Sequence, residues 1–226
     1  MKKTKIDWCD ATVNPVVGCK NGCKYCYARK INQRFGFIPN WEEPQFFKER
    51  LEQLNSKTPK SIFMDSMSDI GYWEDEWINK VGAATRKNPQ HNYIFLTKGF
   101  CGGFSIGHIF TERELNKAIF YKQNIFIGKT VDTNNKFNVF ENYDFLSIEP
   151  ILEPIDLSLL QHNLYINQVI IGAETGNRKE KVIPKKEWID DIVKQCDKAN
   201  VRVFMKESLR EIMGEDFRQD PLIWKV

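Results

Sequence analysis

Short apolar runs alternate with longer amphipathic stretches along most of the chain. The apolar runs are rich in Val, Ile and Phe and lack a regular apolar/polar alternation, which is typical of strands buried on both faces. These runs are residues 12–17, 61–65, 92–97, 124–129, 144–149, 168–173 and 201–205. The longer stretches predict helices, and they cover residues 26–34, 44–55, 73–87, 111–121 and 184–199.

Strands separated by helices predict parallel βαβ units. Six or seven strands are fewer than the eight that close a barrel, so we expect an α/β fold with a partial, open (β/α) barrel of mostly parallel strands. A doubly wound sheet is the alternative, because it has the same order of elements. We find no repeat or linker along the 226 residues, and we expect residues 1–226 to form a single domain.

Polar residues end nearly every predicted strand. The carboxyl ends of parallel strands form the active face of α/β proteins, so we expect these residues to surround one cavity. They are Asp65, Thr97, Lys98, Lys129, Thr130, Glu149, Glu174 and Lys206. Two alternatives stay open. Strand ends are often polar because the chain meets solvent there, and the charged residues among them can form a buried network that only stabilises the fold.

Half of the six cysteines lie within eight residues, as Cys19, Cys23 and Cys26, with the spacing C-x3-C-x2-C. A loop this tight can direct three thiolates onto one inorganic centre, and its glycines give the backbone the necessary freedom. Three thiolates on a four-iron cube leave one iron open to a small molecule, whereas four complete a tetrahedral zinc site. A zinc site would need Cys9 as its fourth ligand, because the histidines lie far along the chain.

The charges are nearly balanced but unevenly placed. Lys and Arg number 33 and Asp and Glu 30, so a net charge of +3 excludes no class of partner. Residues 20–34 carry five basic residues and no acidic one, and residues 178–186 form a second basic run. The field beside the cysteines would favour an anionic substrate such as a nucleic acid, whereas solvated surface charge is the simpler explanation.

The N-terminus lacks the apolar segment of a signal peptide, and no apolar run approaches the roughly 20 residues that a membrane helix needs. We therefore expect a cytoplasmic protein without a membrane partner. Thiols stay reduced in that compartment, so iron–sulfur clusters can persist there.

The cysteine loop, with Tyr25 directly before its last cysteine, resembles the signature of the radical S-adenosylmethionine (SAM) superfamily. The resemblance implies that Cys19, Cys23 and Cys26 hold a [4Fe-4S] cluster whose open iron binds SAM. It also implies an external electron donor of the flavodoxin or ferredoxin type, and reductive cleavage of SAM to a 5′-deoxyadenosyl radical. Tyr25 would lie against the cluster or the adenine.

Further segments resemble a compact phage and prophage branch of this superfamily, the three-Cys-motif phage proteins, with a distant likeness to spore photoproduct lyase. The segments are residues 10–19, 65–69, 95–98, 145–150 and 170–176, and the likeness runs from about residue 7 to residue 206.

The resemblance also implies roles for the strand-end residues. By position, Asp65, Ser66 and Ser68 replace a Gly-Gly-Glu segment that holds the SAM amino group, although this chain lacks those glycines and the Glu. Lys129 or Thr130 would contact the ribose or carboxylate of SAM. The remaining residues would face the substrate or the far side of the cofactor, and they are Glu149, Glu174 and Lys206.

Three other cysteines lie outside the loop. Cys101 follows a predicted strand, and we hypothesise that it returns a hydrogen atom to a product radical, as a cysteine does in spore photoproduct lyase. An ordinary loop thiol is the alternative. We interpret Cys9 and Cys196 as structural.

Three functions remain open at this point. The first is a radical SAM enzyme that modifies or repairs a nucleic acid or nucleotide. The second is a radical SAM enzyme that acts on a peptide or small metabolite. The third is a non-enzymatic binding module of phage origin, stapled by zinc.

Overall fold

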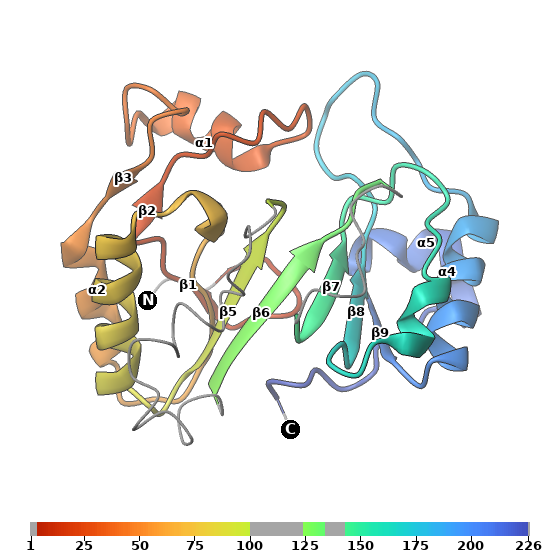
Figure 1. Cartoon of the computed structure of the whole chain (residues 1–226). Helices are drawn as coiled ribbons and strands as arrows, with labels where there is room; N and C mark the ends of the chain where they lie inside the picture. Colours follow the sequence, from red (N-terminus) through yellow and green to blue (C-terminus); the bar gives the residue numbers. More distant parts are fainter. Residues whose placement is uncertain (1–3, 100–123, 134–142, 226) are drawn as a thin grey trace. The chain divides into compact units, whose positions relative to one another are not determined.

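A computed structural model of the chain describes residues 4–99, 124–133 and 143–225 (Figure 1). The helix expected at 111–121 and Cys101 lie outside the described residues. The chain divides into two compact units, Met1–Ile127 and Gly128–Val226, which are described separately below. The expectation of a single domain stays a prediction.

Seven strands form one sheet in the order β1-β4-β5-β6-β7-β8-β9. Their bounds are β1 Ala11–Thr12, β4 Ser61–Phe63, β5 Asn92–Thr97, β6 Ile125–Thr130, β7 Phe145–Ile148, β8 Gln168–Ile171 and β9 Arg202–Met205. The pairings β1–β4, β4–β5, β6–β7, β7–β8 and β8–β9 are parallel. The sheet ends at β1 and β9, so the predicted α/β fold, an open partial barrel of mostly parallel strands, is confirmed.

In the first unit, the expected strand at 12–17 is divided in two. β1 is followed by Pro15 and then by β2 (Val16–Val17), which pairs antiparallel with β3 (Gln45–Phe46) in a separate two-stranded sheet. The helix expected at 44–55 is wrong at its start, because Gln45 and Phe46 belong to this pairing and Phe47 N–H donates to Pro15 O at 2.7 Å. The rest of that stretch is the 3₁₀ helix η1 (Lys48–Asn55) rather than an α-helix.

Two α-helices of the first unit lie where the sequence predicts them. Helix α1 (Tyr27–Phe35) follows the cysteines directly. Helix α2 (Asp75–Lys87) has acidic residues in its first turn and basic residues in its last, which suits the helix dipole. It buries Ile78 and Val81, and the 3₁₀ helix η2 (Ile70–Tyr72) precedes it.

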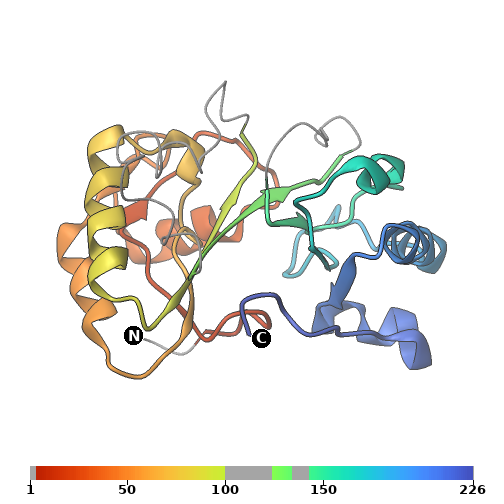
Figure 2. The same cartoon turned by 60° about the horizontal axis from the view of Figure 1, so that its bottom comes forward.

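In the second unit, β7 and β8 are buried along their whole length, as expected for strands covered on both faces. Helix α4 (Lys186–Lys198) packs Ile189, Ile192 and Cys196 into the same core as these strands, and Figure 2 shows this helix nearly end-on. The shorter elements are η7 Ser158–His162, η8 Glu207–Leu209, α5 Arg210–Met213 and η9 Gly214–Asp216.

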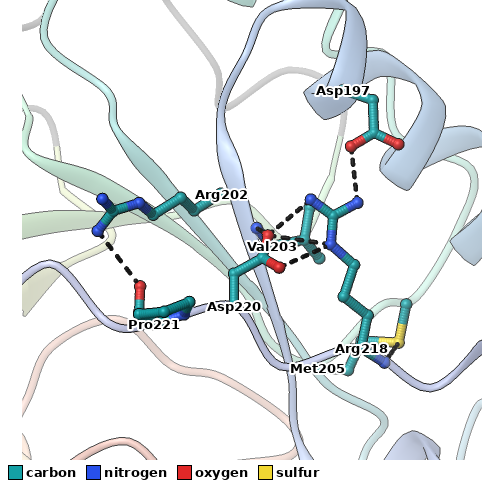
Figure 3. A network of polar contacts seen from close by, with 7 residues as sticks. All are labelled: Asp197, Arg202, Val203, Met205, Arg218, Asp220 and Pro221. Carbon is teal, nitrogen blue, oxygen red and sulfur yellow. Dashed lines mark hydrogen bonds and ion pairs between the residues drawn. The ribbon is translucent and has the colours of Figure 1, made fainter.

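The C-terminal segment of the second unit is fastened by Arg218 (Figure 3). Its guanidinium donates to Asp220 at 2.6 Å and to Asp197, at the end of α4, at 2.6 Å. Asp220 in turn accepts a 2.8 Å hydrogen bond from Val203 N–H of β9. Arg218 therefore ties residues 218–220 to α4 directly and to β9 through Asp220.

None of the helices in the described ranges is long and apolar enough to cross a membrane.

Candidate functional site

The cysteine loop lies between β2 and α1, and its entry is a tight backbone approach. Gly18 has φ +112°, and a Cβ there would lie 2.8 Å from Pro44 Cα. Gly18 N–H donates to Met67 O at 3.0 Å, and Cys19 N–H donates to Trp41 O at 2.9 Å. A glycine is required here because a side chain would collide with backbone. The first cysteine is thus placed by main-chain contacts to two distant segments.

Three side-chain contacts hold the loop against the carboxyl ends of β4 and β5. Asn21 donates to Asp69 at 2.6 Å, and Lys98 Nζ donates to the Tyr25 hydroxyl at 2.6 Å. The Tyr27 hydroxyl donates to Ser66 O at 2.9 Å. The loop is therefore anchored to the edge where parallel α/β proteins place their ligands.

Asp69 is the centre of this anchor, and it is almost fully buried. Besides Asn21, it accepts hydrogen bonds from Gly71 N–H at 2.9 Å, the Thr97 hydroxyl at 2.7 Å and Lys98 N–H at 2.8 Å. Sequence reasoning assigned Asp69 no role, although it closes the Asp65–Asp69 segment that carried the resemblance.

A second side chain secures Asn21. The Tyr72 hydroxyl donates to Asn21 Oδ1 at 3.0 Å, so the nitrogen and the oxygen of the Asn21 side-chain amide both form hydrogen bonds. Burial and the nearby Asp69 raise the pKa of Tyr72, which keeps the hydroxyl protonated as a donor. Asn21 and Tyr72 were also missed, because neither residue type by itself signals a role in a cysteine loop.

The three cysteines have the donor chemistry of an iron–sulfur ligand set. All are partly exposed and none forms a disulfide within the described residues. Cys26 caps α1 by accepting Arg29 N–H at 3.3 Å, and Cys19 accepts Asn21 N–H at 3.5 Å. Burial raises the pKa of Cys19 to about 12, and Asp69 and the other two cysteines add to the rise. A bound cation would reverse this effect, because coordination deprotonates a thiol.

The three sulfurs do not form a preorganised metal site. Among the described residues, no three side chains of His, Cys, Asp or Glu lie together as a metal site, with Cys9 included or without it. Cys9 is buried before β1. The three thiols fit an iron–sulfur cluster by their number and chemistry. Because they are partly exposed, a cluster can reach them from solvent.

The expected SAM-contacting segment after β4 is engaged within the protein. Asp65 is fully enclosed and accepts from Leu96 N–H at 3.1 Å and from Ile70 N–H at 3.3 Å. Burial, with Asp69 nearby, raises its pKa well above the usual range. Ser66 Oγ donates to Asn14 Oδ1 at 2.9 Å, and Ser68 Oγ accepts from Trp73 Nε1 at 3.0 Å. Their contact with SAM stays a prediction.

In the second unit, Lys129 and Thr130 lie inside β6 rather than after it, and both are buried. Thr130 is opposite Ser147 of β7 in the parallel register. Lys129 Nζ lies 5.4 Å from the ring centroid of Tyr143, a cation–π distance. β6 therefore ends one residue beyond the predicted run 124–129.

The three strand-end charges of the second unit form two ion pairs. Lys206 pairs with Glu149, and their aliphatic stems pack over Gly172, where a Cβ would lie 3.1 Å from Lys206 Cδ. Glu174 is held by Arg178 through two 2.7 Å hydrogen bonds. The hydrogen bonds from Arg178 lower the pKa of Glu174. The structure thus brings Glu149 and Lys206 together and gives Glu174 a different partner.

Comparisons with known proteins cover the chain to different extents. MJ0683, an uncharacterised protein of Methanocaldococcus jannaschii, is 35% identical over 68 residues, which are 29% of this chain and 26% of that protein. The match therefore spans about a quarter of that relative's length. A solved structure of spore photoproduct lyase complexed with dinucleoside spore photoproduct has a TM-score of 0.47 and 10% identity, over 86% of this chain and 76% of that one.

The family comparison covers far more of the chain. Residues 3–213 match the model of the DUF5131 family, described as a protein of unknown function. The match includes β1 to β9 and the whole cysteine loop. The chain belongs to the DUF5131 family.

Proposed function

We propose that this protein is a radical SAM enzyme that modifies or repairs a nucleic acid or nucleotide, with a [4Fe-4S] cluster held by Cys19, Cys23 and Cys26. The observation that carries the proposal is the anchoring of the cysteine loop by Asn21 and Tyr25 at the ends of β4 and β5. When bound, such a cluster supplies the electron that cleaves SAM reductively. A partner of the flavodoxin or ferredoxin type would deliver that electron.

The chain's own residues would prepare the site for this cofactor. Backbone N–H groups of Asn21 and Arg29 point at the sulfurs of Cys19 and Cys26, and such donors stabilise negative charge on a ligand. Asp69 fixes the spacer between the first two cysteines, and Lys98 fixes Tyr25. These contacts restrain the backbone between the cysteines, so the loop loses less conformational freedom when it binds a cluster.

The charge around the loop supports an anionic substrate. Residues 11–41 contain five Lys or Arg and no Asp or Glu. A phosphate backbone would gain from this field through counterion release.

The test begins with anaerobic purification and reconstitution of the full chain. We expect iron with acid-labile sulfide, a broad absorbance near about 400 nm, and 5′-deoxyadenosine when SAM and a strong reductant are added. Cys19→Ala, Cys23→Ala and Cys26→Ala should each lose these signals. Cys9→Ala is the matched control, and it should retain them.

The opposite pattern would contradict the proposal. Tetrahedral zinc without sulfide, lost in Cys9→Ala as well as in the three loop variants, would identify a zinc-stapled module. Deuterium from labelled DNA that appears in 5′-deoxyadenosine would support the nucleic-acid substrate. Transfer only from a peptide or metabolite would favour that alternative class, and the DNA should also be examined for products of radical addition.

A further inference from the structure

Two exposed phenylalanine rings stand together at the C-terminal end of α1. Phe35 is 61% exposed and Phe37 44% exposed, and their ring centroids lie 5.9 Å apart at an interplanar angle of 29°. Large aromatic side chains are normally buried, so a stacked pair left in solvent indicates a binding role. Phe35 is the last residue of α1 and Phe37 follows the C-cap Gly36, and both belong to the first unit.

The backbone holds this ring pair in place. Gly36, between the two rings, adopts the left-handed conformation with φ +63°, and its N–H closes α1 on Asn32 O at 2.7 Å. The buried Asn32 side chain then makes reciprocal hydrogen bonds with Ile38, accepting from its N–H at 3.1 Å and donating to its carbonyl at 3.0 Å. Phe37 is thus fixed between the capped end of α1 and Ile38, whose backbone is held by Asn32.

Two guanidinium groups accompany the rings. Arg34 lies 5.2 Å from the centroid of Phe35, and Arg50 lies 5.7 Å from that of Phe37. Arg50 also donates to Asn14 O at 2.8 Å, so it supports Phe37 from within the fold. Arg34 has an exposed side chain and remains accessible to a ligand.

One face of α1 continues this surface toward the cysteines. Tyr27, Lys30 and Arg34 are spaced i, i+3 and i+7, so they share a face, and all three are exposed. Tyr27 directly follows Cys26, and Phe35 lies eight positions further along the helix, a rise of about 12 Å. A ligand on the ring pair would therefore lie a short helix length from the loop.

We propose that Phe35 and Phe37 form a stacking platform for the bases of a single-stranded nucleic acid, whose phosphates contact Arg34 and Lys30. This inference rests on the substrate class in the proposed function and assigns it a site. Sequence-tolerant single-strand binding combines aromatic faces, on which bases stack, with basic side chains that contact the backbone. This surface has exposed aromatic rings and exposed basic side chains. The charge of α1 complements a phosphate backbone, since the helix carries Arg29, Lys30 and Arg34 and no acidic side chain.

The test is fluorescence anisotropy with labelled oligothymidylate and oligouridylate of about 15 nucleotides and a duplex of the same length. The full chain, purified anaerobically, is titrated without SAM between about 50 and 200 mM NaCl. Wild type should bind single strands more tightly than duplex, and the two homopolymers distinguish DNA from RNA. Phe35→Ala/Phe37→Ala should weaken binding by between about 5- and 150-fold per lost stack, with an unchanged salt slope.

The charge variants give a different signature. Lys30→Ala and Arg34→Ala should each reduce the slope of log affinity against log salt by about 0.7. Phe35→Trp should retain binding, whereas Phe35→Leu should weaken it by the factor expected for one lost stack, because a base stacks on a ring and not on an alkyl chain. The matched controls are Leu164→Ala and Lys198→Ala, exposed residues of the second unit, which should change neither affinity nor slope.

Three outcomes would overturn the inference. The first is equal binding by wild type and a folded Phe35→Ala/Phe37→Ala variant, and the second is a preference for duplex. The third is self-association of wild type that this variant abolishes while oligonucleotide binding is unaffected. The last would identify a second copy of the chain as the occupant. Because binding is measured without SAM, a failure of SAM cleavage leaves the binding result standing. A protein that cleaves SAM but does not use Phe35 and Phe37 retains the proposed chemistry and loses this site.

Discussion

The side-chain amide of Asn21 donates a 2.6 Å hydrogen bond to Asp69, and this contact joins the spacer between the first two cysteines to the segment that follows β4. Asp69 uses its remaining acceptor capacity on Gly71, Thr97 and Lys98. A single buried carboxylate therefore connects the loop to the ends of two parallel strands. Its removal should affect both the stability of the fold and the order of the loop.

We expect Asp69→Asn to lower the free energy of unfolding by about 2 kcal/mol, because an amide nitrogen would face donors that now meet an oxygen. The loop should also loosen, so Cys19, Cys23 and Cys26 should be alkylated faster. Urea unfolding and mass spectrometry of iodoacetamide labelling measure the two effects. Asp156→Asn is the control, since Asp156 is exposed and its contact with Ser158 N–H is one that Asn can also make. Unchanged labelling in Asp69→Asn would contradict the anchoring role.

Asp65 should give stability an unusual pH dependence. Burial, with Asp69 nearby, raises its pKa, so the folded protein binds this proton more tightly than the unfolded chain does. Its contribution to stability is then fully present below the unfolded pKa of about 4 and declines as the pH rises toward the folded pKa. Asp65→Asn does not titrate, so its stability relative to wild type should improve as the pH rises above about 4. A difference that is constant with pH in urea unfolding would contradict this.

Two glycines with positive φ should respond differently to alanine. Gly36 has open space around its missing side chain, so Gly36→Ala adds only backbone strain and should destabilise by about 1–2 kcal/mol. In Gly18→Ala the new Cβ would also lie 2.8 Å from Pro44 Cα and 2.9 Å from Trp41 O, both backbone atoms. Its loss of stability in urea unfolding should therefore be clearly larger. Equal losses would show that the loop entry adjusts to a side chain.

The Arg218 network should contribute stability that acid removes. Burial alone would raise the pKa of Asp220, but hydrogen bonds from Arg218 and Val203 N–H bring it below its usual value. A depressed carboxyl pKa stabilises the fold above the unfolded pKa, and that stabilisation is lost as the pH falls through the folded pKa. Arg218→Ala should destabilise by about 1 kcal/mol at neutral pH, since the pair is partly screened by solvent.

The difference between Arg218→Ala and wild type should shrink below about pH 4. Arg202→Ala is the comparison variant and should have a smaller effect, because Arg202 makes a 3.5 Å contact with Pro221 O and acts on Asp220 through its charge alone. Thermal unfolding across a pH series measures both variants. A difference that persists at low pH would mean that the packing of Arg218, rather than its charge, stabilises the C-terminal segment.

The parts of the fold that local pattern determines could be predicted from the sequence. Residues 92–97 form an apolar run between turn-forming residues, and β5 covers those residues. Helix α1 begins and ends within one residue of the predicted stretch 26–34, because Cys26 caps its start and Gly36 its end. These signals act over a few residues, so periodicity and capping are sufficient to find them.

Long-range pairing could not be predicted in this way. Residues 44–55 have a helical pattern, yet β3 forms because β2 lies beside it and supplies hydrogen-bond partners. The same holds at the site, where the spacing and the resemblance predicted a role for the three cysteines but gave no indication of the residues that anchor their loop. Asn21 and Asp69 are 48 positions apart, and only the folded chain shows that they meet.

The close approach at Gly18 also limits how the cysteine motif can be moved between proteins. A synthetic peptide of residues 18–30 would retain all three thiols but lose the carbonyls of Trp41 and Met67, the Asp69 carboxylate and the Lys98 ammonium that shape it. A graft into another scaffold would have to bring the Trp41–Pro44 turn and both strand ends with it. The transferable unit is therefore a set of separate segments rather than a thirteen-residue motif.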